Sequence, residues 1–411
     1  MSNAVAQRPD YTFKYNAKLG RHGWLRLTPA YSVKLVKELV AHAPKDTIIL
    51  DPFSGTATTG VVAAELGLNA HLFDINPFLL WLGNVKCTVY EASEIDTLKY
   101  ETLPRVLSLY REKLAEAEGR YWQPDIYNIE RWWCGHTLLL ISALRSAIVE
   151  LCGEPEGTDV NNLVWIAFCR LIIETSSAAF NHVSMSFKGG VTTFEVNQIE
   201  NLFANILGNI LESAQSNLGG AAEVYLCDAR SPVSQRGALY DYIVTSPPYP
   251  NRMTYIRELR PYMYWTKFLK EAKEAGELDW QAIGGTWGTA TSKLKGWVNT
   301  VDALPEELAN IVDLIAVSGD KNSDLMSQYV YKYFSDMHLH FRNLRSVLNS
   351  GATLDYIVGN SSFYGNLVHT EKIMEQSLAS LGYSEVHSCI VRKRNSKKEL
   401  YEFRISARWN A

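Results

Sequence analysis

A serine, two prolines and a tyrosine follow a short apolar run that is typical of a buried strand. The run, residues 242–244, leads directly into Thr-Ser-Pro-Pro-Tyr at 245–249. Proline lacks an N–H group and has a fixed φ, so it cannot continue a central strand, and it favours extended geometry in the residue before it. Residues 246–249 are therefore predicted to form a stiff loop, which is useful where a reacting group must be held still.

The stretch DPFSGTATTG, residues 51–60, also has residue types that suit ligand binding. A strand is expected to end at Asp51, and Gly55 and Gly60 flank a polar turn into a helix. Glycine lets backbone N–H groups approach a ligand closely near a helix N-terminus. The stretch has neither the G-x-G-x-x-G spacing of dinucleotide sites nor the G-K-[ST] of a Walker loop. The alternative is an ordinary strand-to-helix turn.

Two further aspartates follow predicted strands. Asp74 ends the second strand, where a carboxylate is well placed to accept hydrogen bonds from a ribose diol. The alternative is that Asp74 caps the helix that begins at INPFLLW, and both roles are compatible. Asp228 ends a third strand and could contact an adenine amino group in the same crevice.

Taken together, these stretches resemble the S-adenosylmethionine (AdoMet)-dependent amino-methyltransferases that modify exocyclic amines of DNA bases. DPFSGTATTG is similar to their cofactor loop, Asp74 and Asp228 to the acidic residues after their second and third strands, and TSPPY to their catalytic motif. Serine at the first motif position is associated mostly with cytosine N4 methylation, and Asp or Asn there with adenine N6. The resemblance covers the sheet-forming parts of the chain and implies a restriction–modification methylase, with a cognate restriction endonuclease as its functional partner.

The resemblance also assigns roles to single residues. It implies that the catalytic residues are Ser246, Pro247, Pro248 and Tyr249. It implies that the cofactor-binding residues are Thr28, Asp51, Pro52, Phe53, Gly55, Thr56, Asp74, Asn76, Asp228 and Ser246. The Thr28 hydroxyl, at a predicted helix start, could reach the methionine carboxylate of AdoMet, although a simple helix cap is the alternative. The family loop is closer to G-x-G, and Ala57 replaces its later glycine. This replacement costs little if residue 57 has a negative φ. No metal is expected.

The chemistry of amine methylation agrees with this assignment. An exocyclic amine is a poor nucleophile because its lone pair is delocalised into the base ring. Ser246 Oγ and the Pro247 carbonyl are natural acceptors for both amine hydrogens, Pro248 would fix that carbonyl's direction, and Tyr249 can stack on the base. The amine then attacks the sulfonium methyl in line, which is largely a matter of positioning. A base inside a duplex cannot reach such a pocket, so it must be flipped out or already unpaired.

Basic and aromatic residues alternate after the catalytic loop, in NRMTYIRELRPYMYW. We expect phosphate contacts beside a flipped base from Arg252, Arg257, Arg260 and, in SFKGG, Lys188. The alternative is a helix with a solvated basic face and a buried aromatic face. The basic turn RKRNSKK, residues 392–398, is another candidate for contact with DNA, although an ordinary solvated hairpin loop explains it somewhat better.

These residues need a particular set of elements to bring them together. The strand, glycine loop, helix and second strand of residues 46–74 form a βαβ unit, and a helix before them is predicted from Thr28 to Pro44. The sheet resumes at EVYLCDAR and YDYIVTSPPY, a helix from residue 325 is closed by Gly351, and the last two strands form a hairpin around the basic turn. The predicted fold class is α/β, a Rossmann-like AdoMet-dependent methyltransferase sheet, mostly parallel, with a large helical insertion.

The predicted organisation has five parts. They are residues 1–90, with the N-terminal helix and cofactor-binding half; 91–218, a helical insertion and candidate target-recognition region; 219–266, the catalytic half; 267–324, a second insertion forming a structured loop and candidate DNA contact; and 325–411, the remaining sheet and hairpin.

Composition excludes several classes of protein. The net charge of −4 gives no global nucleic-acid signature, so a DNA-binding surface must be local. Six scattered cysteines without a C-x-x-C pair argue against disulfides or a zinc site and fit a reducing cytoplasm. No signal-like start and no apolar run of about 18 residues are present, so no membrane span is expected. Carbon-5 methylation is excluded because it needs a nucleophilic thiolate and no Pro-Cys dipeptide exists.

The sequence therefore predicts a site-specific DNA methyltransferase that modifies cytosine N4. Three alternatives remain open: adenine N6 methylation by the same machinery, an RNA amino-methyltransferase that contacts 2′-hydroxyls, and a catalytically inert DNA-binding subunit that keeps the fold.

Overall fold

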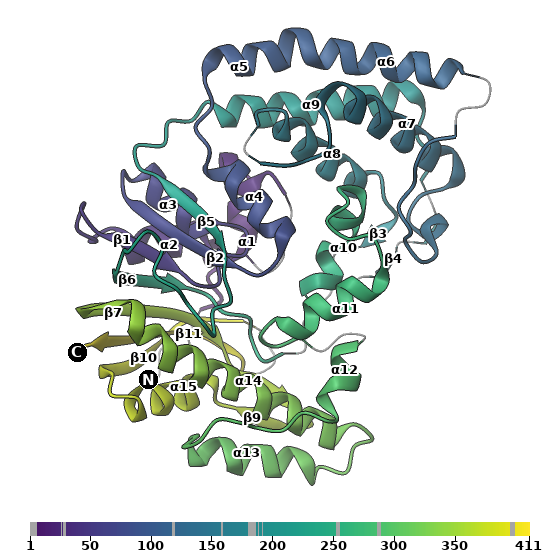
Figure 1. The fold of residues 1–411 in the computed structure, drawn as a ribbon. Coiled ribbons are helices and arrows are strands. Elements are labelled where there is room, and N and C mark those ends of the chain that lie inside the picture. Colours follow the sequence, from purple (N-terminus) through teal and green to yellow (C-terminus); the bar gives the residue numbers. More distant parts are fainter. Residues whose placement is uncertain are drawn as a thin grey trace.

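The computed structural model describes residues 6–25, 27, 30–116, 120–157, 159–179, 186–187, 189–190, 192–251, 255–285, 289–394 and 399–411. Its centre is a seven-stranded sheet in the order β10-β11-β7-β6-β1-β2-β5 (Figure 1). The strands are β1 (Ile48–Asp51), β2 (Asn69–Asp74), β5 (Ala222–Leu226), β6 (Tyr240–Thr245), β7 (Leu348–Gly359), β10 (Ser384–Lys393) and β11 (Tyr401–Trp409).

Most neighbours in this sheet are parallel. β1 pairs in parallel with β2 and β6, β2 with β5, and β6 with β7, whereas β11 is antiparallel to β7 and β10. The register aligns Leu50 of β1 with Ile243 of β6, so both strands end at the same edge of the sheet. This mixed α/β architecture confirms the predicted fold class, with the C-terminal hairpin formed by β10 and β11.

Helices cover both faces of the sheet because its strands are apolar on both sides. α2 (Val33–Val40), α3 (Thr58–Glu65) and α4 (Pro77–Cys87) lie on one face, and α14 (Ser323–Leu344) and α15 (Thr370–Ser380) on the other. α3 packs so closely that a Cβ on Gly60 would lie 2.4 Å from Leu72 Cδ1. The predicted βαβ unit is therefore present, with a glycine where helix and sheet meet.

Two predicted helix ends are wrong. α2 begins at Val33 with Ser32 as its N-cap, and the Ser32 hydroxyl accepts a hydrogen bond from the backbone N–H of Lys34. Thr28, the predicted start, lies outside the described residues. α14 ends at Leu344, and β7 already begins at Leu348, so Gly351 lies inside a strand instead of closing the helix.

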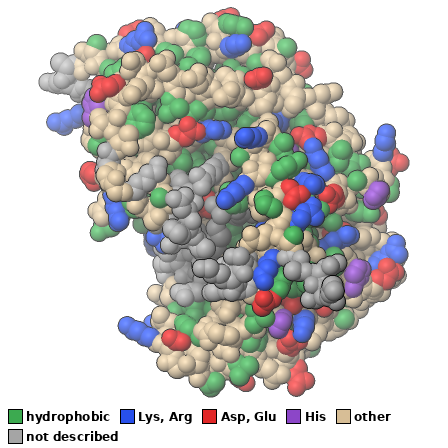
Figure 2. Space-filling model, turned by 180° about the vertical axis from the view of Figure 1, so that it is seen from behind, with side chains coloured by type: hydrophobic (Ala, Val, Ile, Leu, Met, Phe, Trp, Pro, Cys, Tyr) green, Lys and Arg blue, Asp and Glu red, His purple; other side chains and the backbone are tan. Residues whose placement is uncertain are grey.

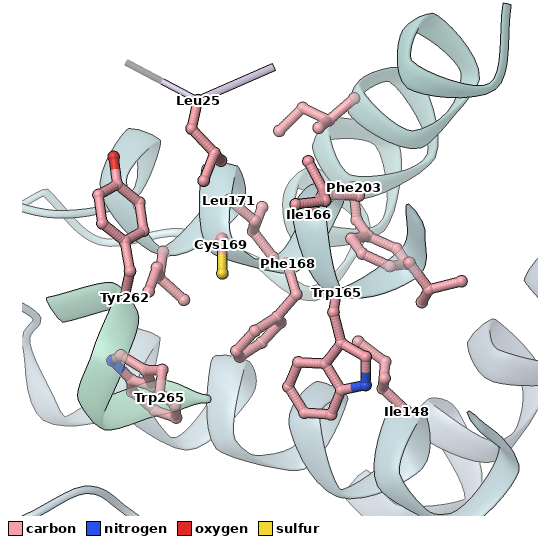
Figure 3. Packing of buried hydrophobic residues seen from close by; sticks show 14 of the residues in the cluster. Leu25, Ile148, Trp165, Ile166, Phe168, Cys169, Leu171, Phe203, Tyr262 and Trp265 are labelled. Atoms are coloured by element: carbon pink, nitrogen blue, oxygen red, sulfur yellow. The ribbon is translucent and has the colours of Figure 1, made fainter. Parts of the chain in front are cut away.

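A helical block follows β2. It contains α5 (Ala92–Thr97), η3 (Leu98–Thr102), α6 (Leu103–Ala115), η4 (Ile129–Arg131), α7 (Gly135–Cys152), α8 (Asn162–Glu174), α9 (Val196–Ala214) and the short strands β3 (Ala178–Ala179) and β4 (Ser186–Phe187). Its core is rich in aromatic side chains, and Figure 3 shows Trp165 and Phe168 of α8 beside Tyr262 and Trp265 of α10 (Tyr255–Trp265). The helix that follows the predicted catalytic loop is thus anchored in this block.

One helix of the block also has the composition of a membrane span. α7 is long and apolar enough by these two criteria, but 56% of it is buried inside the protein. Such burial is typical of a core helix.

The segment 267–324 differs from the structured loop expected there. Its described residues form the helices α11 (Ala272–Gln281), α12 (Thr289–Leu294) and α13 (Glu306–Ala316), and α14 begins at its end, at Ser323. Short elements complete the described chain: η1 (Pro9–Tyr11), α1 (Phe13–Asn16), η2 (Gly20–Gly23), η5 (Arg345–Val347), β8 (Ser361–Phe363) and β9 (Asn366–Val368).

Candidate active site

A cavity of about 570 Å³ lies where β1, β2, β5 and β6 end. This is the edge at which open parallel sheets bind ligands, and the volume is typical of small-molecule sites. The cavity brings together most of the predicted site: Pro52, Phe53, Gly55, Thr56, Asp74, Asn76, Asp228, Ser246, Pro247, Pro248 and Tyr249 all line it. Sequence segments that are far apart therefore meet in one place.

Asp51 lies beneath the cavity and is fully buried. Its carboxylate accepts hydrogen bonds from the Phe53 backbone N–H at 3.0 Å and from the hydroxyls of Thr59 and Thr245. Phe53 and Thr59 belong to the glycine loop and α3, while Thr245 directly precedes Ser246. Asp51 thus ties the predicted cofactor loop to the predicted catalytic loop from below.

Ala57 does not meet the condition of a negative φ under which the replacement of glycine would cost little. Its φ is +61° and its ψ is +28°, so it has left-handed backbone geometry at the start of α3. A side chain in this geometry costs roughly 1–2 kcal/mol relative to glycine's freedom. The Ala57 side chain is nonetheless fully buried. Ala57 is therefore a strained position in this loop.

Asp74 is held by the loop on the neighbouring strand. Its Oδ2 accepts from the Gly55 N–H at 3.0 Å and its Oδ1 from the Asn76 N–H at 2.8 Å. Asn76 caps α4, because its side chain accepts from the Phe78 N–H at 3.0 Å. The alternative that Asp74 itself is the cap is therefore wrong. Burial raises the pKa of Asp74 to about 7, although the backbone donors oppose this shift.

Asp228 is engaged by an arginine. Arg230 Nε lies 3.0 Å from Asp228 Oδ1, and Arg230 Nη2 lies 2.7 Å from Oδ2. Burial alone would raise the pKa of Asp228, but the hydrogen bonds from Arg230 outweigh it and the pKa is lowered. Arg230 also donates to the Gln281 carbonyl at 2.6 Å. A role for Asp228 in contacting adenine stays a prediction, and its carboxylate would share its acceptor sites with Arg230.

The Ser246 hydroxyl has a defined direction. Its Oγ lies 3.0 Å from the Ile357 carbonyl on β7, and a carbonyl can only accept, so Ser246 donates its proton to Ile357. The lone pairs of Oγ are therefore left to accept hydrogen bonds. The loop is held on its other side by Tyr333 of α14, whose hydroxyl donates to the Pro248 carbonyl at 2.7 Å.

Several neighbours fix the position of Tyr249. Its hydroxyl donates to Glu402 Oε1 at 2.8 Å, and its backbone N–H donates to the Tyr255 hydroxyl at 3.3 Å. The guanidinium of Arg394 lies over its ring, 5.1 Å from the centroid. The predicted stacking residue is thus held from α10 and from the C-terminal hairpin.

The predicted DNA-contacting residues are only partly described. Lys188 and Arg252 lie outside the described residues, and Arg257 and Arg260 are on α10 but do not line the cavity. Burial lowers the pKa of Arg260. Tyr262 is buried and stacks on Phe78 with ring centroids 5.7 Å apart, which is the buried aromatic face of the alternative.

Among the described residues on the side seen in Figure 2, Lys and Arg side chains lie among Asp and Glu, without a large field of one sign. At the cavity itself, Arg392, Lys393 and Arg394 contribute to the lining. These residues begin the basic turn of the C-terminal hairpin, so the described start of that turn lies beside the catalytic loop.

Sequence reasoning missed several residues that line or support the cavity. Tyr31, whose hydroxyl contacts Thr59, comes from the chain before α2, Tyr333 from α14, and Glu402 from β11. None belongs to a local motif, and only the three-dimensional arrangement identifies them. Among the described residues, no group of three or more His, Cys, Asp and Glu side chains is placed to hold a metal ion.

Residues 13–82 match the DNA methylase family. This range includes the glycine loop and Asp74 but not the catalytic loop. Similarity over nearly the whole chain comes from Type II methyltransferase M.BsoBI of Geobacillus stearothermophilus, which is 22% identical over 95% of this chain and 84% of that protein. No solved structure matches the chain significantly.

Two further relatives match a smaller part. Type II methyltransferase M.MvaI of Kocuria varians is 23% identical over 51% of this chain and 48% of that protein. Type II methyltransferase M.AvaI of a Nostoc species is 24% identical over 61% of this chain and 55% of that protein. Together with the cavity at the sheet edge, the family match and these relatives support a DNA methylase of the restriction–modification type.

Proposed function

We propose that this chain transfers a methyl group from AdoMet to the exocyclic N4 amine of cytosine at a short DNA sequence. It would act in the cytoplasm as the protecting half of a restriction–modification system, with a cognate endonuclease as its functional partner. The observation that carries the proposal is the Ser246 hydroxyl, which donates to the Ile357 carbonyl at 3.0 Å and so keeps its lone pairs for an amine. The resemblance of serine-type TSPPY motifs to cytosine N4 enzymes favours cytosine over adenine.

The residues around the cavity suit AdoMet. When bound, AdoMet supplies an electrophilic methyl group on a sulfonium centre. Asp74, held by two backbone donors at the end of β2, would accept the ribose hydroxyls. Pro52, Phe53, Gly55, Thr56 and Asn76 line the same cavity and would form the rest of the cradle. Asp51 would act from below by holding the loop, and Thr28 stays a proposed contact outside the described residues.

The catalytic loop would align and activate the amine. Ser246 Oγ and the Pro247 carbonyl would accept its two hydrogens, which makes the nitrogen lone pair more available, and Tyr249 would stack on the flipped base. Arg252, Arg257, Arg260 and Lys188 are proposed phosphate contacts. We further propose that residues 91–218 or 267–324 recognise the target sequence, because both lie between parts of the sheet.

Nucleoside mass spectrometry on DNA from cells that express the protein tests the proposal. We expect N4-methyldeoxycytidine with the wild type and a loss of about 100- to 1000-fold in rate with Ser246→Ala, because one pre-positioned acceptor is removed. Ser350→Ala, at an exposed serine on β7, is the matched control and should leave the product unchanged.

Other products would change the proposal in defined ways. N6-methyldeoxyadenosine, absent with Ser246→Ala, would keep the mechanism and overturn the base assignment. Modified RNA with unmodified DNA would assign an RNA substrate. Calorimetric measurement of AdoMet binding distinguishes an enzyme from a catalytically inert DNA-binding subunit. An inert subunit need not bind the cofactor.

A further inference from the structure

The C-terminal hairpin forms one wall of the cavity. Arg392 and Arg394 of its β10 side and Glu402 of β11 line it together with Tyr249. β11 lies beside β7. The Ile357 carbonyl on β7 accepts the hydrogen bond from the Ser246 hydroxyl. The hairpin is therefore next to the predicted catalytic loop, although its sequence suggests only its basic turn as a candidate for contact with DNA.

Glu402 is a buried carboxylate with two partners. Glu402 is only 5% exposed. Arg392 contacts both carboxylate oxygens, with its Nε 2.7 Å from Oε2 and its Nη2 3.0 Å from Oε1. The Tyr249 hydroxyl donates to the same Oε1 at 2.8 Å. A hydrogen bond to an ionised acceptor is stronger than one between neutral groups, and here the arginine fixes the acceptor.

Arg394 and Gly359 also confine the Tyr249 ring. Arg394 lies over it and donates from Nη1 to the Asn360 carbonyl at 2.7 Å. A Cβ on Gly359 would lie 2.2 Å from Arg394 Nη1 and 2.7 Å from Tyr249 Cδ2. Only glycine leaves room for the ring and the guanidinium together at the end of β7. The surroundings thus define one position for the ring.

We propose that Glu402 is a positioning residue for amine methylation. It holds the Tyr249 hydroxyl, so that the ring is in place before a flipped base arrives, and Arg392 holds Glu402. Ordering a side chain on binding costs conformational entropy, and a ring that is already ordered avoids this cost. The proposal rests on the proposed function, because Tyr249 has a base to stack on only in that reaction.

The test measures methylation of unmodified bacterial DNA with AdoMet labelled in its methyl group. Glu402→Ala should lower kcat/KM for DNA about 10- to 100-fold, as expected for a lost hydrogen bond to a charged group, while AdoMet affinity by calorimetry stays within about twofold. Glu402→Gln keeps an acceptor oxygen and should recover part of the loss. Glu385→Ala removes an exposed carboxylate of β10 that pairs with Arg408, and it should behave as the wild type.

A double-mutant cycle separates positioning from a general structural role. Tyr249→Phe removes the hydroxyl but keeps the ring, and Glu402→Gln in that background should cost nothing further. Additive losses in the double variant would overturn the proposal. Wild-type rates in Glu402→Gln and in Tyr249→Phe would also overturn it. These two variants keep the test decisive even if Glu402→Ala does not fold. Wild-type rates in these variants leave the proposed function standing, whereas a wild-type protein that methylates no DNA overturns both.

Discussion

We expect the Asp74 carboxyl group to make AdoMet binding depend on pH. Burial raises its pKa to about 7, so it is largely protonated below neutral pH in the free protein. Ribose hydroxyls that donate to Asp74 favour the ionised form, so binding must release this proton when the pH is below 7. We expect AdoMet affinity to be constant above about pH 8 and to fall by up to tenfold per unit below pH 7, measured by calorimetry across this range.

Asp74→Asn is the control for this prediction. An amide does not titrate, so the variant should bind AdoMet weakly and show only the pH dependence of other groups and of AdoMet itself. If wild type and variant had parallel pH profiles, Asp74 would not be the titrating group.

Single residues also show what the sequence can and cannot predict. Ser246, Asp74 and the glycine loop are recognisable because each lies in a short motif at a strand end, and all of them line one cavity. The left-handed backbone of Ala57 could not be predicted, since alanine rarely adopts it. Glu402 could not be found either, because its contact with Tyr249 joins residues 153 positions apart.

At the scale of elements, α10 connects the catalytic loop to the helical block. Its first residue, Tyr255, accepts a hydrogen bond from Tyr249, and its last, Trp265, is fully buried. The Trp265 ring contacts Trp133 and Phe168, each with centroids 5.7 Å away. α10 therefore links the position of the helical block to the position of Tyr249.

Trp265→Ala should lower the free energy of unfolding by about 3–5 kcal/mol, because it leaves a large cavity among these rings. Chemical denaturation measures the loss. Trp122→Ala, at a tryptophan that is 43% exposed, should cost much less. Equal losses for the two variants would contradict the anchoring role of Trp265.

Elements with strong local signals were predictable, and those set by tertiary contacts were not. The βαβ unit follows from an apolar strand, a glycine turn and an apolar helix, and it is present as β1, α3 and β2. The start of α2 was misplaced because Thr28-Pro29 has a strong capping signature, whereas Ser32 is the cap. The helices of 267–324 were missed because glycines and tryptophans there suggested a loop.

At the scale of the whole molecule, the cavity is lined by parts of the chain that lie far apart in the sequence. A ligand that binds only the folded state stabilises it by about 2.7 kcal/mol at a hundredfold excess over Kd. We therefore expect AdoMet to raise the unfolding temperature of the whole protein in calorimetry. Ser246→Ala should keep this shift, and Asp74→Ala should lose most of it.

The opposite pattern would reassign the two residues. If Ser246→Ala lost the shift as fully as Asp74→Ala, the division of the cavity into a cofactor half and a catalytic half would be wrong.

The parallel pairing of β1 with β6 has a consequence for the order of folding. Leu50 and Ile243 are neighbours in the sheet, and the whole helical block lies between them in the chain. Closing so long a loop is entropically unfavourable, whereas helices and the β1–α3–β2 unit form through local contacts. A folded block brings the two strand ends closer together. The catalytic loop at the end of β6 is therefore expected to reach its place late, after the chain can already form its cofactor-binding unit.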